Sequence, residues 1–207
     1  MTESRPEEII AEAVERFGED RLALAASWQK ETAVLVDLVR KHAPAARIFT
    51  LDTGVLFDET YATWRAVEER YGITVEAYRG DWVPGLWATD PDRCCFLRKV
   101  EPLERALEDA DCWISGVRRD QSPDRAETEE LDWDDRHGLW KANPVATWTE
   151  RDVWAYIALH DLPYNPLHDQ GYSSIGCTHC TLPGAGREGR WAGLEKTECG
   201  LHAPASR

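Results

Sequence analysis

Segments with the apolar spacing of helices alternate along the chain with short apolar segments typical of strands. The helical patterns cover residues 6–17, 31–42, 58–72, 97–109 and 149–160, and the strand patterns cover residues 21–27, 47–54, 73–80 and 112–117. Parallel strands must be joined by crossovers of a dozen or more residues, and these crossovers are usually helices. The alternation therefore predicts an α/β fold with a doubly wound, mostly parallel sheet.

The end of the chain differs in composition from the rest. From Pro163 onward it is rich in proline, glycine and cysteine, which favours an irregular extension over a second domain. We predict that residues 1–182 form the α/β domain and that residues 183–207 form a mobile C-terminal tail rather than an independent domain. A chain of 207 residues is long enough for one such domain with a buried core.

Charge and hydropathy narrow the classes of partner. The net charge of −14 argues against broad binding to nucleic acid, which usually needs a basic face. No apolar run approaches the ~18 residues that a membrane span needs. The acidic stretch at residues 1–20 lacks the basic and apolar regions of a signal peptide. The sequence therefore predicts a cytoplasmic protein with neither a nucleic acid nor a membrane as its partner, and it leaves a homo-oligomer open.

Ligands of doubly wound sheets bind beyond the carboxyl ends of the strands, where three loops are expected after Ser27, Leu51 and Val117. The first, "SWQKET", begins a helix whose free N–H groups suit a phosphate, although it is no Walker A loop and Ser27 could simply cap the helix. The last, "GVRRDQSPDR", carries three arginines, whose planar groups suit phosphate or sulfate. A solvated charged loop is the alternative.

A glycine-rich stretch in the tail, "GAGREG" at residues 184–189, matches the pattern G-x-G-x-x-G. It follows Pro183 rather than a strand, and no βαβ unit surrounds it. We therefore reject a dinucleotide site and interpret these glycines as flexible hinges.

Four of the six cysteines fall into two close pairs, Cys94 with Cys95 and Cys177 with Cys180. In a reducing compartment such pairs indicate metal ligands or catalytic groups rather than disulfides. Zinc ligands usually have two to four residues between them, whereas a 4Fe–4S cubane offers each sulfur its own iron, so the adjacent pair favours the cluster. Two unrelated buried thiol pairs are the alternative. Cys112 lies in a strand pattern and is expected in the core.

The sixth cysteine, Cys199, lies in "EKTECGLH", with Lys196 and His202 three residues away on either side. Residues 183–207 carry four basic and three acidic side chains, so the tail is the least acidic large part of the chain. Nearby cations lower the pKa of a thiol, and the offsets of three share a face if the tail is helical. We interpret Cys199 as a nucleophile that is delivered to a substrate held elsewhere; an incidental terminal thiol is the alternative.

The ordered series "SWQKE", "LDTG", "CCFLRKVEPL", "GVRRDQSPDRA", "KANPVATWTERDVWAYI", "PYNPLHDQGYSSIGCTHCT", "GREGRW" and "EKTECGLH" spans residues 27–202. In these stretches the chain resembles the assimilatory phosphosulfate reductases, and more specifically the bacterial, cluster-containing adenosine 5′-phosphosulfate (APS) reductases. One departure is Trp28, where many relatives carry phenylalanine.

The resemblance implies an adenine-nucleotide α-hydrolase-like (PP-loop) fold and a 4Fe–4S cluster on Cys94, Cys95, Cys177 and Cys180. It implies that Cys199 attacks the sulfur of APS and releases AMP. The resulting S-sulfocysteine would then be reduced by thioredoxin to free sulfite, as part of assimilatory sulfate reduction and cysteine biosynthesis. The substrate-binding residues that it implies are Ser27, Asp52, Thr53, Gly54, Lys99, Gly116, Arg119, Arg187, Arg190 and His202.

Three other functions stay open. A 3′-phospho-APS (PAPS) reductase would use the same thiol chemistry, but such enzymes typically lack the four cluster cysteines. An ATP-using PP-loop ligase or tRNA thiolase would want an SGGxDS-like loop, which this chain lacks, and usually a basic RNA-binding face. A non-enzymatic zinc module that binds nucleotides would be colourless.

Overall fold

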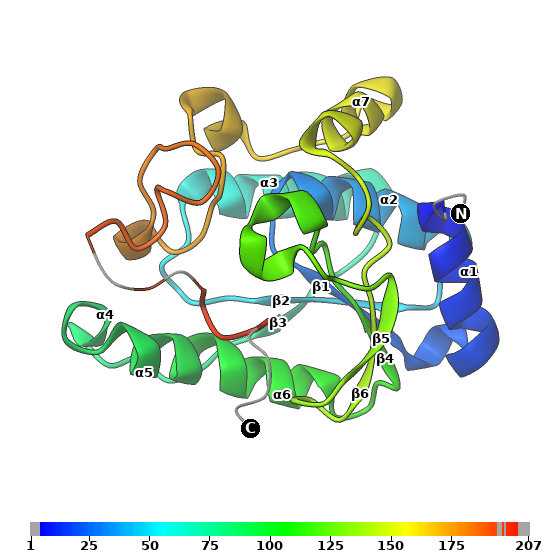
Figure 1. The fold of residues 1–207 in the computed structure, drawn as a ribbon, viewed down its shortest axis with the longest axis horizontal. Helices are drawn as coiled ribbons and strands as arrows, with labels where there is room; N and C mark the ends of the chain where they lie inside the picture. Colours follow the sequence, from blue (N-terminus) through cyan, green and yellow to red (C-terminus); the bar gives the residue numbers. More distant parts are fainter. Residues whose placement is uncertain (1–4, 194–195, 197, 203–207) are drawn as a thin grey trace.

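The computed structural model describes residues 5–193, 196 and 198–202, and in this part of the chain six strands form one sheet (Figure 1). The strand order is β3-β2-β1-β4-β6-β5. The four pairings among β3, β2, β1, β4 and β6 are parallel, and β5 is antiparallel to β6. The strands are β1 Leu22–Ala26, β2 Arg47–Leu51, β3 Glu76–Tyr78, β4 Cys112–Ile114, β5 Leu131–Asp134 and β6 Leu139–Ala142. The predicted mostly parallel sheet is therefore confirmed.

Helices cover both faces of the sheet (Figure 1). One face carries α1 Pro6–Phe17, α2 Lys30–His42, α3 Asp58–Tyr71 and α7 Glu150–His160. The other face carries α4 Leu86–Thr89, α5 Pro91–Cys95, a π-helical turn Phe96–Val100 and α6 Glu101–Leu107. Short 3-10 turns lie at Glu19–Arg21, Arg119–Gln121, Pro123–Arg125, Pro166–Gln170 and Thr178–Cys180.

The central strand β1 shows how the sequence produces two buried faces. Successive side chains of a strand point to opposite faces. Leu22 and Leu24 pack with the larger apolar cluster under α1 and α2, whereas Ala23 packs with the smaller cluster under α6. All three are fully buried. A strand buried on both faces reads as a continuous apolar run rather than an alternation, as the segment "LALAA" does.

Helix ends follow the sequence signals. Gly18 and Gly72 close α1 and α3 with positive φ angles of 83° and 60°, a conformation that costs glycine least. Thr149 caps α7, accepting from the amide of Asp152, whose carboxylate in turn accepts from the amide of Thr149. Among the described residues, no helix has the length and apolar character that a membrane span requires.

The irregular segment after α7 is tied to itself by backbone bonds. The amide of Leu182 donates to the carbonyl of Gly189, and that of Gly184 donates to Gly171. A Cβ added at Gly189 would lie 2.0 Å from the carbonyl oxygen of Leu182. In the described structure, then, Gly189 permits a close backbone approach inside a closed loop, which differs from the hinge expected from "GAGREG".

Candidate active site

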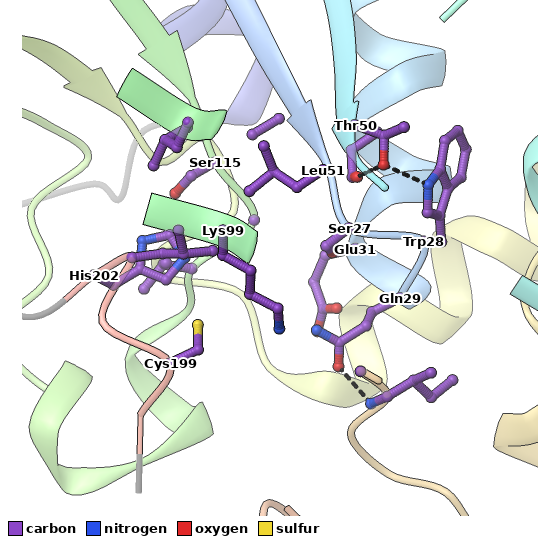
Figure 2. A pocket seen from close by; sticks show the side chains of 18 of the residues that line it. Ser27, Trp28, Gln29, Glu31, Thr50, Leu51, Lys99, Ser115, Cys199 and His202 are labelled. Atoms are coloured by element: carbon purple, nitrogen blue, oxygen red, sulfur yellow. Dashed lines mark hydrogen bonds between the residues drawn. The ribbon is translucent and has the colours of Figure 1, made fainter. Parts of the chain in front are cut away.

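A cavity lies at the carboxyl ends of β1, β2 and β4, where the three predicted loops meet. It encloses about 1000 Å³ of space, open solvent included. Crossovers from β1 and into β4 run on opposite faces of the sheet, so this is the switch point at which open α/β sheets bind ligands. Figure 2 shows Ser27, Trp28 and Gln29 on one side of this cavity and Lys99, Cys199 and His202 on the other.

The loop after β1 is held in one conformation by its own side chains. The hydroxyl of Thr32 accepts from the amides of Ser27 and Trp28, at 3.0 Å each. Trp28 has a φ of 60° and is buried, and its indole N–H donates to the hydroxyl of Thr50 at 2.7 Å. Its ring also stacks on Trp64 with centroids 5.4 Å apart. The departure "SWQKE" thus gives Trp28 a hydrogen bond that phenylalanine lacks, and Ser27 lines the cavity.

Gln29 and Lys30, whose contacts the sequence left open, fasten the same loop to the segment before Cys177. The side-chain oxygen of Gln29 accepts from the amide of Ile175 at 3.0 Å. The Lys30 ammonium is buried, donates to the carbonyl of Ser173 at 3.0 Å and lies 3.1 Å from a carboxylate oxygen of Glu150.

The loop after β2 contributes only part of what was expected. Thr53 lines the cavity, but its neighbours Asp52 and Gly54 do not. The Asp52 carboxylate is buried and accepts from the hydroxyl of Tyr61 at 2.7 Å, from the amide of Gly54 at 2.9 Å and from Arg79. Burial alone would raise the pKa of Asp52, but these donors lower it below its usual value. In this structure Asp52 orders the loop instead of facing the cavity.

In the loop after β4, Gly116 lines the cavity and Arg119 does not. The Arg119 guanidinium donates to the carbonyl of Thr128 at 2.8 Å and is about two-fifths exposed. The expected arginine is replaced by Arg125, which lines the cavity. The reason is local: the 3-10 turn at Pro123–Arg125 brings the chain back toward the cavity. A proline after "DQS" is the sequence signal that points to such a turn.

Close packing explains why the first residue of that loop is glycine. A Cβ at Gly116 would lie 2.8 Å from Cβ of Glu31. Glu31 is buried and accepts from the buried guanidinium of Arg118 and from the side-chain amide of Gln121. The pair Glu31–Arg118 therefore joins the start of α2 to the loop after β4 and holds two walls of the cavity together.

Four basic side chains line this cavity among the described residues: Lys99, Arg125, Arg187 and Arg190. Lys99 comes from the π-helical turn Phe96–Val100, and π-helical turns are frequent at functional sites. Arg190 is buried and donates to the carbonyl of Ile175 at 3.2 Å. A Cβ at Gly176 would lie 2.4 Å from its guanidinium, so a larger residue there would displace the Arg190 side chain. The cluster makes this wall of the cavity suited to an anion.

The tail carries Cys199 into this cationic wall (Figure 2). Burial alone would raise the pKa of Cys199, but Lys99, the amide of Leu201 and Arg190 together lower it below its usual value. Around Cys199 the described residues, 196 and 198–202, are not helical, and Lys196 pairs with Asp92. The cations expected on a helical face are thus replaced by Lys99 from the π-helical turn and by Arg190 from an earlier part of the tail.

The residues around Cys199 dock the tail at several points. Glu198 pairs with Arg125 and Arg187, and the carbonyl of Gly200 accepts from Arg136. Leu201 packs against the apolar cluster under α6, and His202 lines the cavity. Of the implied substrate residues, the cavity brings together Ser27, Thr53, Lys99, Gly116, Arg187, Arg190 and His202.

The four paired cysteines line a second, smaller cavity beside the first. Cys94 and Cys95 are the last two residues of α5. Cys177 is held against the loop after β2 by an antiparallel β-bridge to Leu56 and by its thiol, which donates to the hydroxyl of Thr53 at 3.3 Å. All four thiols are free. In the described part of the chain, no three His, Cys, Asp or Glu side chains are placed to hold a metal ion. The thiols therefore share one cavity without meeting around a single point. Cys112, in contrast, is fully buried in β4, as expected.

The chain is similar to known proteins over most of its length. The model of the phosphoadenosine phosphosulfate reductase domain family matches residues 21–183. An adenosine 5′-phosphosulfate reductase from Salinibacter ruber is 44% identical over 95% of this chain and 83% of that protein. A phosphoadenosine 5′-phosphosulfate reductase from Gloeobacter violaceus is 46% identical over 96% of this chain and 88% of that protein.

Solved structures confirm the expected PP-loop fold. The phosphoadenylyl-sulfate reductase of Candida auris, in a phosphate complex, has a TM-score of 0.77 at 30% identity and covers 87% of this chain and 91% of its own. The FMN adenylyltransferase of Candida glabrata has a TM-score of 0.67 at 15% identity over 86% of this chain and 63% of its own, which shows a shared fold alone. With most of its length matched by the family model, the chain belongs to the phosphoadenosine phosphosulfate reductase domain family.

Proposed function

We propose that the chain reduces adenosine 5′-phosphosulfate to sulfite and AMP, with Cys199 as the nucleophile. The observation that carries the proposal is the position of the Cys199 thiol in a cavity that is also lined by Lys99, Arg125, Arg187 and Arg190. Cations of this kind neutralise the charges of a phosphosulfate and of an approaching thiolate, which would otherwise repel each other. Relatives that carry the substrate in their names support the choice of nucleotide.

The chemistry has two steps. The Cys199 thiolate attacks the sulfate sulfur, the bond between that sulfur and the bridging phosphate oxygen breaks, and AMP leaves with the electron pair. This step leaves an S-sulfonate on Cys199. A dithiol reductant, which we propose to be thioredoxin, then attacks the Cys199 sulfur and expels sulfite, and its second thiol resolves the mixed disulfide. The dithiol supplies both electrons, so the reaction belongs in a reducing compartment, and we propose the cytoplasm.

We further propose that Cys94, Cys95, Cys177 and Cys180 hold a 4Fe–4S cluster. The support is a donor set of four thiols that line one cavity. When bound, the cluster would cross-link the end of α5 to the loop that carries Cys177 and Cys180. Iron and acid-labile sulfide analysis tests this; a colourless protein that holds one zinc ion would overturn it.

A 3′-phosphorylated substrate is the second candidate, because the Gloeobacter violaceus relative is named a phosphoadenosine 5′-phosphosulfate reductase. The two candidates differ in kcat/KM for the two nucleotides. We expect a preference for the nucleotide without the 3′-phosphate, and the opposite preference would decide for the second candidate.

The proposed nucleophile is tested by mass spectrometry after the protein is mixed with adenosine 5′-phosphosulfate in the absence of reductant. We expect one sulfonate adduct, on the peptide that contains Cys199. The Cys199→Ser variant should form no adduct while it still binds AMP. An adduct on another cysteine, or sulfite production by Cys199→Ser, would show that the nucleophile is misassigned.

A further inference from the structure

His202 rests on a platform formed by two neighbouring strands. Trp113 in β4 and Lys141 in β6 are register partners, so their side chains stand side by side on one face of the sheet. The His202 ring stacks on Trp113 with centroids 5.4 Å apart and planes at 12°. The Lys141 ammonium lies 4.7 Å from the centre of the Trp113 ring and 3.2 Å from Nδ1 of His202.

The platform is itself fixed. Trp113 is 1% exposed, and its indole N–H donates to a carboxylate oxygen of Asp134 at 3.2 Å. The same oxygen lies 2.9 Å from Nδ1 of His137. Since a buried ring with a bonded N–H has little freedom, the position of His202 against it is defined by packing as well as by the bond to Lys141.

The contact between Lys141 and His202 determines where the imidazole proton lies. An ammonium group has three donors and no acceptor, so Nδ1 of His202 must accept and cannot carry a proton. A neutral imidazole that accepts at Nδ1 carries its proton on Nε2. Because His202 lines the cavity, this Nε2–H is the group that the ring offers to a ligand there.

The charges around the pair agree with a neutral ring. Burial and the positive neighbours Lys141, Arg125 and Arg187 hold the pKa of His202 well below its usual value. Burial, with a smaller contribution from Arg125, lowers the pKa of Lys141 to about 8, against the pull of Asp134, Glu198 and Asp132. At neutral pH the ammonium form of Lys141 therefore still predominates, and it stays the donor.

We propose that Lys141 is a positioning residue that holds His202 as the neutral Nε2–H tautomer, so that the tail presents a hydrogen-bond donor to an anionic oxygen in the cavity. The proposal rests on the proposed function for the identity of that anion, a phosphosulfate. Lys141 acts through His202: it determines which ring nitrogen donates. Such a donor stabilises negative charge without adding a base that competes for the thiol proton of Cys199.

The direct test is the ¹⁵N NMR spectrum of the ligand-free protein labelled in its histidine rings, with the His202 signals assigned from a His202→Gln variant. We expect Nε2 protonated and Nδ1 unprotonated at neutral pH. An Nδ1–H tautomer or an imidazolium ring would overturn the proposal. This readout needs no turnover, so it stands even if the proposed function fails.

Two substitutions of Lys141 separate the donor from mere packing. Lys141→Met keeps the aliphatic stem without a donor, and it should give a mixture of tautomers and a ring that titrates at higher pH. Lys141→Arg keeps a charged donor and should restore the Nε2–H form. Should Lys141→Met leave the tautomer unchanged, the proposal is wrong. If that variant does not fold, the spectrum of the wild-type protein decides.

A double-mutant cycle with AMP as the probe tests whether Lys141 acts through the ring. Lys141→Met should weaken AMP binding by roughly 3–10-fold, which is a part of the usual worth of one hydrogen bond to a charged group because the mixture of tautomers keeps some of the donor. In the His202→Gln background, where no ring is present to orient, the same substitution should change the Kd little. Equal losses in both backgrounds would mean that Lys141 acts by its own charge, against the proposal.

Discussion

Glu198 in the tail is held by one edge of the Arg125 guanidinium: its two carboxylate oxygens each accept a hydrogen bond, from Nε and Nη2, at 3.0 Å. The second of these oxygens also accepts from Arg187 at 2.9 Å. All three side chains line the cavity and are mostly buried. Two of the four described cations that line the cavity are therefore already paired with the residue next to Cys199.

This pairing predicts that Glu198→Gln changes both ligand affinity and access to the thiol. Removing the negative charge leaves Arg125 and Arg187 more available, so the Kd for AMP should fall roughly 3–10-fold, or ~1 kcal/mol. The tail should also dock less firmly, and alkylation of Cys199 by iodoacetamide should become faster. Titration calorimetry and peptide mass spectrometry measure the two effects. Glu188→Gln, an exposed carboxylate on the same segment, is the control and should change neither; weaker AMP binding by Glu198→Gln would contradict the prediction.

The lowered pKa of Cys199 predicts the pH dependence of its reactivity. The thiolate is the reactive form, so the rate of alkylation should rise with pH to a midpoint below that of an ordinary cysteine, near 8.5. Lys99 is the largest stabilising influence on the thiolate. The Lys99→Met variant should therefore move the midpoint to higher pH. The rate is measured with iodoacetamide over a pH series, and a midpoint that is the same in both proteins would exclude Lys99 as the cause.

The second cavity predicts a difference between two cysteine substitutions. Cys177→Ser removes a proposed cluster ligand and should abolish iron binding. Cys112→Ala removes a thiol that is fully buried in β4 and should keep the iron, at a cost of about 1–2 kcal/mol in unfolding free energy. Iron analysis and thermal unfolding distinguish the two. Full iron content in Cys177→Ser would show that the ligand set is different.

A buried carboxylate predicts an acid-sensitive part of the stability. Asp37 in α2 accepts from the hydroxyls of Tyr71 in α3 and Tyr156 in α7, at 3.0 and 2.7 Å, and from Lys41. Burial would raise the pKa of Asp37, but these donors lower it. Because the pKa of Asp37 is lower in the folded than in the unfolded chain, its carboxylate stabilises the fold at any pH above the unfolded value, near 4. This stabilisation is lost as the pH falls from that value through the folded-state pKa.

The corresponding variant is Asp37→Asn, which keeps the shape and removes the charge. It should lose about 1–3 kcal/mol at neutral pH, which for a domain of this size lowers the Tm by about 2–4 °C per kcal/mol. The difference from the wild-type protein should shrink below pH ~4. Asp135→Asn changes an exposed carboxylate and should leave the Tm unchanged. A difference that persists unchanged in acid would show that the charge of Asp37 is not involved.

Four of the six strands lie in segments whose sequence pattern predicts a strand. The strands β1 to β4 are apolar runs between helices, and the predicted ranges contain them. The hairpin of β5 and β6, in contrast, is too short to predict: "LDWD" alternates apolar and acidic residues over only four positions, and Trp133 in it is exposed. It forms because β6 pairs with β4, a contact between residues far apart in sequence. Long-range pairing of this kind leaves no periodic signal.

The predictions of the site residues divide in the same way, into those that a local motif indicates and those that depend on contacts between distant segments. Lys99, Arg187, Arg190 and His202 were identified through ordered motifs, and the cavity gathers all four. The choice between Arg119 and Arg125 depended on the path of a loop with two successive 3-10 turns, which spacing alone does not determine. Asp52 is buried for a similar reason, because Tyr61 and Arg79 reach its carboxylate from elements that the motif "LDTG" does not contain. The directions in which the side chains of Asp52, Arg119 and Arg125 point could be found only from the three-dimensional structure.

Lys99 and Arg190 line both cavities, the one that holds the tail thiol and the one that holds the paired cysteines. These two cations form a common partition, so the electric potential on one side depends on what occupies the other. The charge on the paired cysteines in the smaller cavity and the charge of a ligand in the larger cavity therefore influence each other. A redesign of either cavity has to take account of the other.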